Sequence, residues 1–224
     1  MSLTPALHPR VTRPQAILFD WDNTLVDSWA TIHEALNFLM VAMDLPLWTI
    51  AETRERVRLS LREAFPRIFG ERWEEARDIY LDRFRAIHLE RLTPLPGRTE
   101  LLARLSDEGI FGGVVSNKTG SRLRREADHI GWTARFGSIV GAGDAPIDKP
   151  DAAPVRLALL PSGINPGVTV WLVGDTGIDM ECARNAGCVS VLLGNGMSEG
   201  ELELCSPSFM FPDCQALFRF LQGL

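Results

Sequence analysis

Two carboxylates stand one residue apart at the end of a short apolar run: residues 17–19 are Ile-Leu-Phe, and Asp20 and Asp22 follow. Two negative charges so close together repel each other, and each raises the pKa of the other unless a cation offsets them. The pair therefore suits a site in which a divalent ion lies beside a carboxylate that acts as a nucleophile. The alternative is an ordinary turn that is capped by Asp20 and Asp22, with Asn23 and Thr24 as turn residues.

Three later segments end in similar polar residues. Each has an ordinary interpretation when taken alone, as a helix N-cap, a solvated lysine or a carboxylate favoured by a helix dipole. Their joint occurrence argues against coincidence, because the carboxyl ends of parallel strands meet at one edge of a sheet, where ligands bind. The residues are Ser116 and Asn117 after the run 110–115, Lys149 before Pro150, and Asp175 and Asp179 after the run 168–173.

The elements that must position these residues alternate between strands and helices. Near-continuous apolar runs between helical stretches indicate a parallel sheet with helices on both faces, which is an α/β fold. After the first strand, the predicted strands are residues 110–115, 138–140, 168–173 and 189–193, and the predicted helices are residues 98–107, 121–129, a segment after Pro150, 177–185 and 213–221.

A small all-helical unit is predicted directly after the first strand. Apolar residues recur at three- and four-residue steps over 29–43, 57–65 and 73–87, and we expect Pro66 and Gly70 to end the second stripe. The predicted domains are a catalytic core of residues 15–27 and 94–224, an inserted helical cap of residues 28–93 that returns through a rigid Pro-Gly connector, and a flexible leader of residues 1–14.

At this point the sequence resembles the haloacid dehalogenase-like superfamily, and specifically its phosphatases, from about residue 17 to the C-terminus. Four motifs of that superfamily occur in order and on the expected elements. The resemblance implies a Rossmann-like parallel sheet core with an inserted all-helical cap. The motifs are Asp20-Trp21-Asp22-Asn23-Thr24, Ser116-Asn117, Lys149-Pro150 and Gly174-Asp175-Thr176-Gly177-Ile178-Asp179.

The resemblance implies a catalytic role for several motif residues. Asp20 would attack phosphorus and form an aspartyl-phosphate, which splits a hard hydrolysis into two steps. Asp22 would protonate the leaving alcohol and then deprotonate water. Ser116, Asn117 and Lys149 would bind the phosphoryl group, and Lys149 would also offset the charge that gathers on it during transfer.

The resemblance also implies a Mg²⁺ cofactor. Asp20, Asp175 and the backbone carbonyl of Asp22 would hold the ion, with water and a substrate oxygen completing an octahedron. Asp179 would act from outside this shell or lend a ligand through water.

Two features of the sequence limit which reactions of that superfamily we expect. Asp22 favours phosphoryl transfer, because related dehalogenases lack an acid at that position. The helical insertion contains no lysine, which disfavours phosphonate hydrolysis through a Schiff base and weakens the case for a phosphosugar mutase. The chain thus looks like a phosphoglycolate phosphatase-type enzyme, whose cap, hinged near residues 27–28 and 93–97, closes over a small organic phosphate.

Other functions stay open. A sugar phosphatase, a nucleotidase or a mutase could use the same machinery, and a binding protein could keep the fold without turnover. Trp21 is bulkier than the usual Phe or Leu and could narrow the pocket and alter substrate choice. Arg54, Arg56, Arg58 and Arg62 are available on the cap, but an arginine-rich helix is usually a solvated face.

Composition excludes several classes of protein. The chain has 224 residues, 46% of them hydrophobic, and a net charge of −6, which indicates a soluble globular protein without general affinity for nucleic acid. Its apolar runs fall short of the roughly 20 residues of a membrane span, and the N-terminal segment lacks the apolar centre of a signal peptide. Four cysteines without a Cys-x-x-Cys pattern indicate reduced thiols in the cytoplasm.

Lysine is scarce. The chain has 23 basic residues when Lys and Arg are counted together, and only Lys118 and Lys149 are lysines. A compact ammonium is not interchangeable with a guanidinium at a tight phosphate site, so each lysine requires a separate interpretation. Lys149 belongs to a motif, whereas we expect Lys118 to face solvent. The expected partner is a small phosphorylated metabolite, bound by a monomer or homodimer.

Overall fold

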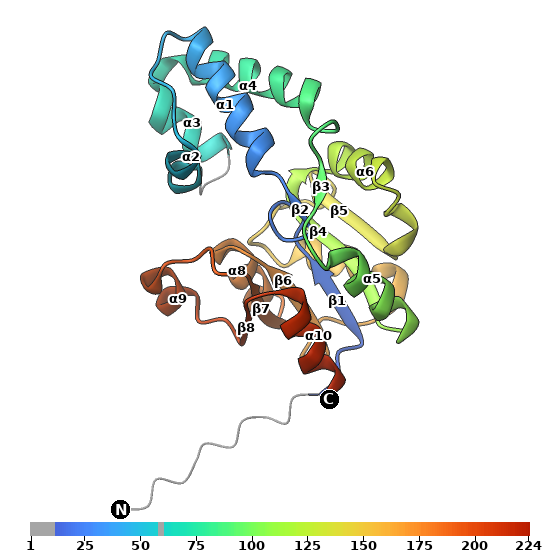
Figure 1. Ribbon diagram of the computed structural model, residues 1–224. Coiled ribbons are helices and arrows are strands. Elements are labelled where there is room, and N and C mark those ends of the chain that lie inside the picture. The colour runs from blue at the N-terminus through green and yellow to red at the C-terminus, as the bar shows by residue number, and fades with distance from the viewer. Residues whose placement is uncertain (1–11, 58–60) are drawn as a thin grey trace, which may run out of the picture.

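The computed structural model describes residues 12–57 and 61–224, without the side chains of residues 61–63. Most of the predicted leader, part of the second helical stripe and Arg58 therefore lie outside the described residues, as does the side chain of Arg62. Figure 1 shows two parts of the molecule, a twisted sheet wrapped by helices and a helical unit above it.

Six parallel strands form the sheet, in the order β5-β4-β1-β6-β7-β8. The central strand β1 pairs with β4 on one side and β6 on the other, and its four residues are fully buried because both faces of the sheet are covered. The strands are β1 (Ala16–Phe19), β4 (Phe111–Thr119), β5 (Ser138–Ala142), β6 (Val170–Gly174), β7 (Val189–Leu193) and β8 (Phe209–Phe211).

Helices cover both faces of this sheet. Ile17 and Phe19 of β1 pack in one apolar cluster with α5, α6 and α10, whereas Ala16 and Leu18 pack in another with α7 and α8. Alternate residues of a strand point to opposite faces, so one short strand serves both clusters. The predicted α/β class is confirmed. These helices are α5 (Arg98–Asp107), α6 (Gly120–His129), α7 (Ala153–Leu159), α8 (Gly177–Asn185) and α10 (Cys214–Gln222).

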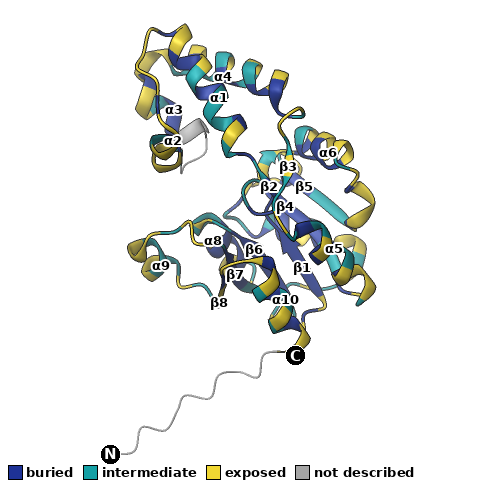
Figure 2. Cartoon of the chain, viewed as in Figure 1, coloured by how far each residue is buried: buried dark blue, intermediate teal, exposed yellow. Residues whose placement is uncertain are grey.

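The described residues between the first strand and the rest of the sheet form four helices, and these make a separate unit that carries buried residues of its own (Figure 2). Its buried cluster includes Leu36, Leu39, Phe65 and Phe84. The chain enters this unit through β2 (Val26–Asp27) and leaves it through β3 (Thr93–Pro94), and the two strands pair antiparallel. The helices are α1 (Trp29–Ala42), α2 (Ile50–Arg56), α3 (Leu61–Phe69) and α4 (Trp73–Ile87).

Some elements differ from the prediction. Pro66 lies inside α3 and does not end it; the cost of its missing N–H is borne because neighbouring Phe65 packs edge-on against Phe69 and Tyr80. Strand β4 continues past its expected end at residue 115, and helix α9 (Glu199–Cys205) and edge strand β8 were not predicted. Among the described helices, none is long and apolar enough to span a membrane.

Candidate active site

Asp20, Lys149 and Asp179 meet at the carboxyl edge of the sheet. Asp20 follows β1, Lys149 lies in the loop between β5 and α7, and Asp179 lies in the first turn of α8. The ammonium of Lys149 donates to Oδ1 of Asp20 at 2.7 Å and to Oδ1 of Asp179 at 2.6 Å. All three side chains are at most 10% exposed, so the ion pairs are shielded from water.

The local sequence fixes the position of Asp179. Thr176 is the N-cap of α8, and Oδ2 of Asp179 accepts bonds from the backbone N–H of Thr176 at 3.1 Å and from its hydroxyl at 2.7 Å. Gly174 leaves the room for this arrangement, because a Cβ at that position would lie 2.2 Å from Cγ of Asp179. A side chain at residue 174 would therefore displace Asp179.

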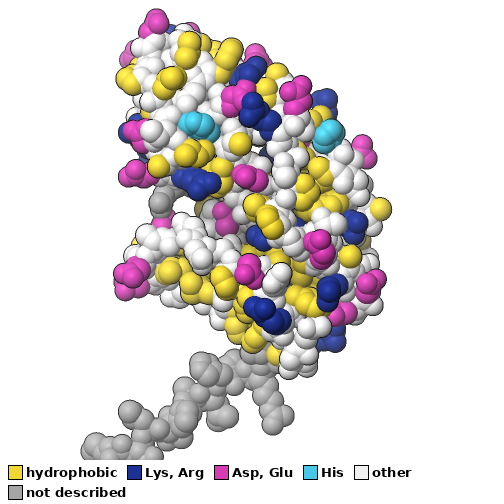
Figure 3. Space-filling model, in the orientation of Figure 1, with side chains coloured by type: hydrophobic (Ala, Val, Ile, Leu, Met, Phe, Trp, Pro, Cys, Tyr) yellow, Lys and Arg dark blue, Asp and Glu magenta, His cyan; other side chains and the backbone are white. Residues whose placement is uncertain are grey.

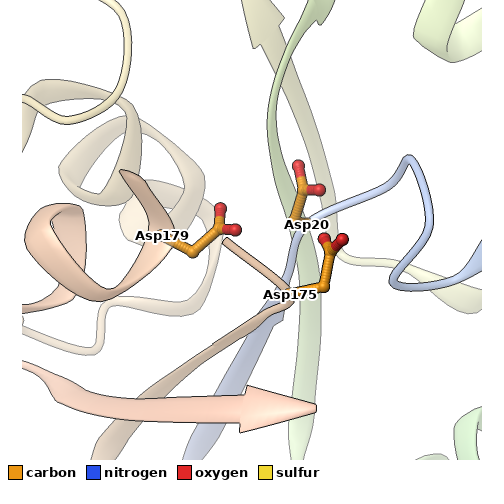
Figure 4. A group of neighbouring side chains, drawn as sticks. All are labelled: Asp20, Asp175 and Asp179. Carbon is orange, nitrogen blue, oxygen red and sulfur yellow. The ribbon is translucent and has the colours of Figure 1, made fainter. Parts of the chain in front are cut away.

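Asp175 follows β6 and completes a group of three carboxylates with Asp20 and Asp179 (Figure 4). Each residue offers one oxygen, and these oxygens lie within 4.8 Å of one another. Thr24 donates its hydroxyl hydrogen to Oδ1 of Asp175 at 2.9 Å. The turn that places Thr24 passes through Asn23 at a φ of +60°, a conformation that asparagine adopts more readily than most residues.

The electrostatics of this group favour a cation. Burial, with the charges of Asp179 and Asp22, raises the pKa of Asp20 to about 6 although Lys149 opposes the shift. Burial, with the charges of Asp20 and Asp179, raises the pKa of Asp175 well above its ordinary value. Burial opposes the charge of Lys149, but Asp179 and Asp20 outweigh it and raise the pKa of the ammonium. Negative charge thus exceeds positive charge in this group.

The donor set fits Mg²⁺. All the ligand atoms on offer are carboxylate oxygens, which this ion prefers, and opposite oxygens around it lie about 4.2 Å apart because each bond is about 2.1 Å long. The three carboxylate oxygens lie within 4.8 Å of one another, which is near enough for them to reach one ion. The residues present therefore match the ion that the sequence motifs imply.

Ser116 and Asn117 lie toward the carboxyl end of β4, and Asn117 contacts the backbone of Lys149. Oγ of Ser116 accepts a bond from the backbone N–H of Lys118 at 3.2 Å, which leaves its hydroxyl hydrogen available to a ligand. Asn117 donates to the carbonyl oxygen of Lys149 and accepts from the backbone N–H of Lys149, both at 3.0 Å. The amide of Asn117 therefore positions Lys149, and its contact with substrate stays a prediction.

Lys118 does not face solvent, and that expectation was wrong. Its side chain is 7% exposed, and the ammonium donates to Oδ1 of Asp22 at 2.7 Å and to Oε2 of Glu126 at 2.6 Å. Burial lowers the pKa of Lys118, but the charges of Asp22 and Glu126 outweigh it and raise that pKa. The physical reason for the difference is that β4 continues to Thr119, so Lys118 lies in the strand instead of a solvated loop.

Trp21 is buried, and the expectation that it narrows the pocket was also wrong. Its ring is fully inaccessible and meets Trp132 edge-on with centroids 6.0 Å apart. Its indole N–H donates to Oε2 of Glu126 at 2.7 Å. Since successive residues of an extended chain point to opposite sides, Trp21 points into the core and away from the carboxylate of Asp20.

Glu126 and His88 were missed by sequence reasoning. Glu126 of α6 is fully buried and accepts a further bond from Nδ1 of His88 at 2.7 Å. A signal was present in the sequence, because Glu126 lies three residues after Leu123 and next to Ala127 on the buried side of α6. A carboxylate on an apolar stripe is rarely buried without partners.

A cavity of about 640 Å³ lies on the helical unit, away from the carboxylates. Its lining includes the exposed side chains of Phe38, Val41 and Leu47, with Arg83 and Arg91 beside them. Figure 3 shows hydrophobic and basic side chains mixed on the helical unit at the top of the view. The predicted site residues do not line it. The predicted site residues therefore lie at the sheet edge and not in this cavity.

The chain is similar to several known proteins. A family profile described as haloacid dehalogenase-like hydrolase matches residues 17–193. A phosphoglycolate phosphatase of Caulobacter vibrioides is 30% identical over 195 residues, which are 84% of this chain and 82% of the relative. An N-acetylmuramic acid 6-phosphate phosphatase of Pseudomonas aeruginosa is 30% identical over 180 residues, or 78% and 79% of the two chains. A solved haloacid dehalogenase-like hydrolase from Streptococcus pneumoniae shares the fold, with a TM-score of 0.84 and 23% identity over 94% of this chain and 99% of its own.

Proposed function

Because the chain belongs to the haloacid dehalogenase-like hydrolase family and is a phosphatase, we propose that it hydrolyses a small organic phosphate monoester with Mg²⁺, through an aspartyl-phosphate on Asp20. The observation that carries this proposal is the buried group of Asp20, Asp175 and Asp179 around Lys149. Burying several carboxylates together costs free energy, and such groups with shifted pKa values gather at functional sites.

Asp20 is the proposed nucleophile, and Asp22 the proposed acid and base. The carboxylate of Asp20 attacks phosphorus, so that an Asp20 oxygen–phosphorus bond forms while the ester bond breaks, and Asp22 gives its proton to the leaving oxygen. Asp22 then takes a proton from the water that attacks the phosphorus of the aspartyl-phosphate. This second step releases inorganic phosphate and restores Asp20.

Two neighbours are the proposed ligands of the phosphoryl group. The hydroxyl of Ser116 and the ammonium of Lys149 would donate to the oxygens on which negative charge gathers during transfer. The two hydrogen bonds from Asn117 to the backbone of Lys149 support this role by holding the ammonium in position.

Mg²⁺ would be held by Asp20, Asp175 and the backbone carbonyl of Asp22, with Asp179 in support. The oxygen-only donor set and its excess negative charge support this assignment. When bound, the ion would offset the charges of the carboxylates and of the phosphoryl oxygens. Thr24 contributes indirectly, through its hydrogen bond to Asp175.

Phosphoglycolate, or an ester that resembles it, is the first candidate substrate because a relative of that activity matches most of the chain. A sugar phosphate is the second candidate, since the N-acetylmuramic acid 6-phosphate phosphatase is equally similar at 30% identity. The helices α1 to α4 would act as a cap over the substrate. The four cysteines, which are unpaired in the described chain, suit a cytoplasmic enzyme that acts on a soluble metabolite as a monomer or homodimer, without nucleic acid or membrane.

The test is the release of inorganic phosphate from phosphoglycolate, N-acetylmuramic acid 6-phosphate and a nucleoside monophosphate, with Mg²⁺ or with EDTA. We expect Mg²⁺-dependent hydrolysis of one of the first two esters, and its loss in Asp20→Asn, whose circular dichroism should match the wild type. Turnover in EDTA would contradict the metal assignment. Activity of Asp20→Asn near the wild-type level would contradict the covalent route.

A further inference from the structure

A further buried carboxylate, outside the group of three, lies close to the site. Glu126 is fully inaccessible and accepts hydrogen bonds from the indole of Trp21 at 2.7 Å, from Nδ1 of His88 at 2.7 Å and from Nζ of Lys118 at 2.6 Å. A buried ionic cluster of this kind is seldom more stable than an apolar packing of equal volume. Its presence therefore calls for an explanation beyond stability.

Lys118 connects Glu126 to Asp22. Its ammonium lies between the two carboxylates, at 2.7 Å from Oδ1 of Asp22, and 5.4 Å from the centroid of the Phe84 ring. Two of the three ammonium hydrogens are thus donated to carboxylates, and the charge lies within cation–π distance of the Phe84 ring. The long side chain is thereby held in one conformation, although lysine is otherwise among the most flexible residues.

Only one of the two carboxylate oxygens of Asp22 accepts hydrogen bonds from the described residues. Both Lys118 and the hydroxyl of Ser28 donate to its Oδ1. Among the described residues, no hydrogen bond is made to its Oδ2. This arrangement leaves Oδ2 as the oxygen that can carry a proton toward a leaving group.

We propose that Glu126, Lys118 and His88 are positioning residues. They orient the carboxyl group of Asp22 toward the leaving oxygen, and they make this orientation depend on the position of the cap. This inference rests on the proposed phosphatase function. Glu126 holds Lys118, Lys118 holds Oδ1 of Asp22, and His88 links both to α4. The network acts on the protonation of the leaving group, and the attack by Asp20 does not depend on it.

The link to the cap runs along one side of α4. The rings of Tyr80 and Phe84 lie 5.8 Å apart, and those of Phe84 and His88 lie 5.6 Å apart, as expected for residues four positions apart on a helix. Phe84 faces the ammonium of Lys118, and His88 bonds to Glu126. A displacement of α4 would therefore loosen Lys118, so Asp22 is fully held only while α4 keeps these contacts.

The experiment compares two esters that differ in their need for an acid. p-Nitrophenolate leaves without a proton, whereas the alkoxide of phosphoglycolate requires one, and kcat/KM reports the step in which either leaves. We expect Glu126→Gln to lower kcat/KM for phosphoglycolate by about 10- to 100-fold, a part of the usual contribution of a general acid. The value for p-nitrophenyl phosphate should change less than about threefold, since no proton is delivered in that reaction.

Two further variants make the test decisive. Arg124→Gln removes another ion pair of α6, to Asp144, and should leave both esters unaffected. The double variant Lys118→Met/Glu126→Leu removes both charges together, which leaves neither of them buried and unpaired if Glu126→Gln folds poorly. It should show the same selective loss for phosphoglycolate.

Several results would overturn the proposal. An equal loss for the two esters, or wild-type values for both in the double variant, would show that the network is merely structural. If the wild-type protein hydrolyses none of phosphoglycolate, N-acetylmuramic acid 6-phosphate and p-nitrophenyl phosphate, the phosphatase function is refuted, and the positioning role with it. The two failures are thus distinguishable, because only the second appears in the unmodified protein.

Discussion

Thr24 and Asp175, 151 residues apart in the sequence, are joined by a hydrogen bond of 2.9 Å from Oγ1 of Thr24 to Oδ1 of Asp175. Thr24 is fully buried, and its bond lowers the pKa of a carboxyl that burial and neighbouring charges raise. The turn after β1 therefore supports a proposed metal ligand that is delivered by β6.

Thr24→Val should weaken Mg²⁺ binding by about 10- to 100-fold, because Asp175 loses the hydroxyl that orients it. The measurement is the rise of Tm with Mg²⁺ concentration, which reports binding without activity. Thr31→Val, at another buried threonine that lies in α1, is the control. An unchanged Mg²⁺ dependence in Thr24→Val would show that Thr24 only shapes the turn.

Lys149→Met should lower kcat by about 10²- to 10³-fold, since it removes a fixed positive charge next to the proposed position of the phosphoryl group. It should also lower the free energy of unfolding by about 3–5 kcal/mol, because Asp20 and Asp179 keep their burial and lose their partner. Phosphate release and urea unfolding measure the two effects. Lys149→Arg should not restore activity, because a guanidinium is bulkier than the ammonium it replaces; full activity in this variant would contradict the tight fit.

The metal-free protein should lose stability as pH rises through the range in which Asp20 ionises. Its carboxyl has a pKa of about 6 in the folded protein against 3.8 in the unfolded chain, and Asp175 is shifted in the same direction. The folded state thus binds more protons between these values, so the free energy of unfolding falls with rising pH. This contribution is complete below pH 3.8 and is lost through about pH 6.

Urea unfolding in EDTA at several pH values measures this dependence. The difference between the wild type and Asp20→Asn isolates the contribution of Asp20 from those of other groups. Saturating Mg²⁺ should flatten the wild-type curve. A difference that grows in favour of the wild type as pH rises would mean that folding lowers the pKa of Asp20, contrary to this expectation.

Gly174→Ala should reduce activity at least about tenfold and destabilise the fold by about 1–3 kcal/mol, because the new Cβ would overlap Asp179. Gly167→Ala is a matched control, since a Cβ there meets no atom within 4 Å. Phosphate release and thermal unfolding compare the two variants. Similar effects in both would show that the contact of residue 174 with Asp179 has no special importance.

Much of the sheet could be predicted because its strands are nearly continuous apolar runs. Strands β1 and β6 are buried on both faces, and such strands leave a clear signal in the sequence. Strand β8 has three residues, and Met210 at its centre is 51% exposed. So short and partly exposed an edge strand carries no comparable pattern.

The same contrast holds for the site. The sequence alone could group four of the site residues, because each of them follows a predicted strand and the carboxyl ends of parallel strands share one edge. These residues are Asp20, Lys149, Asp175 and Asp179. The partners of Lys118 could not be predicted in this way, because its bonds to Asp22 and Glu126 depend on how far β4 extends and on the packing of α6. Those are properties of tertiary structure that spacing along the chain does not encode.

The pairing of β2 with β3 has a practical consequence. Asp27 lies opposite Thr93, so the polypeptide crosses from one half of the molecule to the other and back at neighbouring points. A short loop could bridge these two positions if the helices were excised, and a different insertion could be grafted at the same junction without altering the strands that bear the carboxylates. The architecture is in this sense modular, with an exchangeable helical unit on a constant sheet that bears the carboxylates.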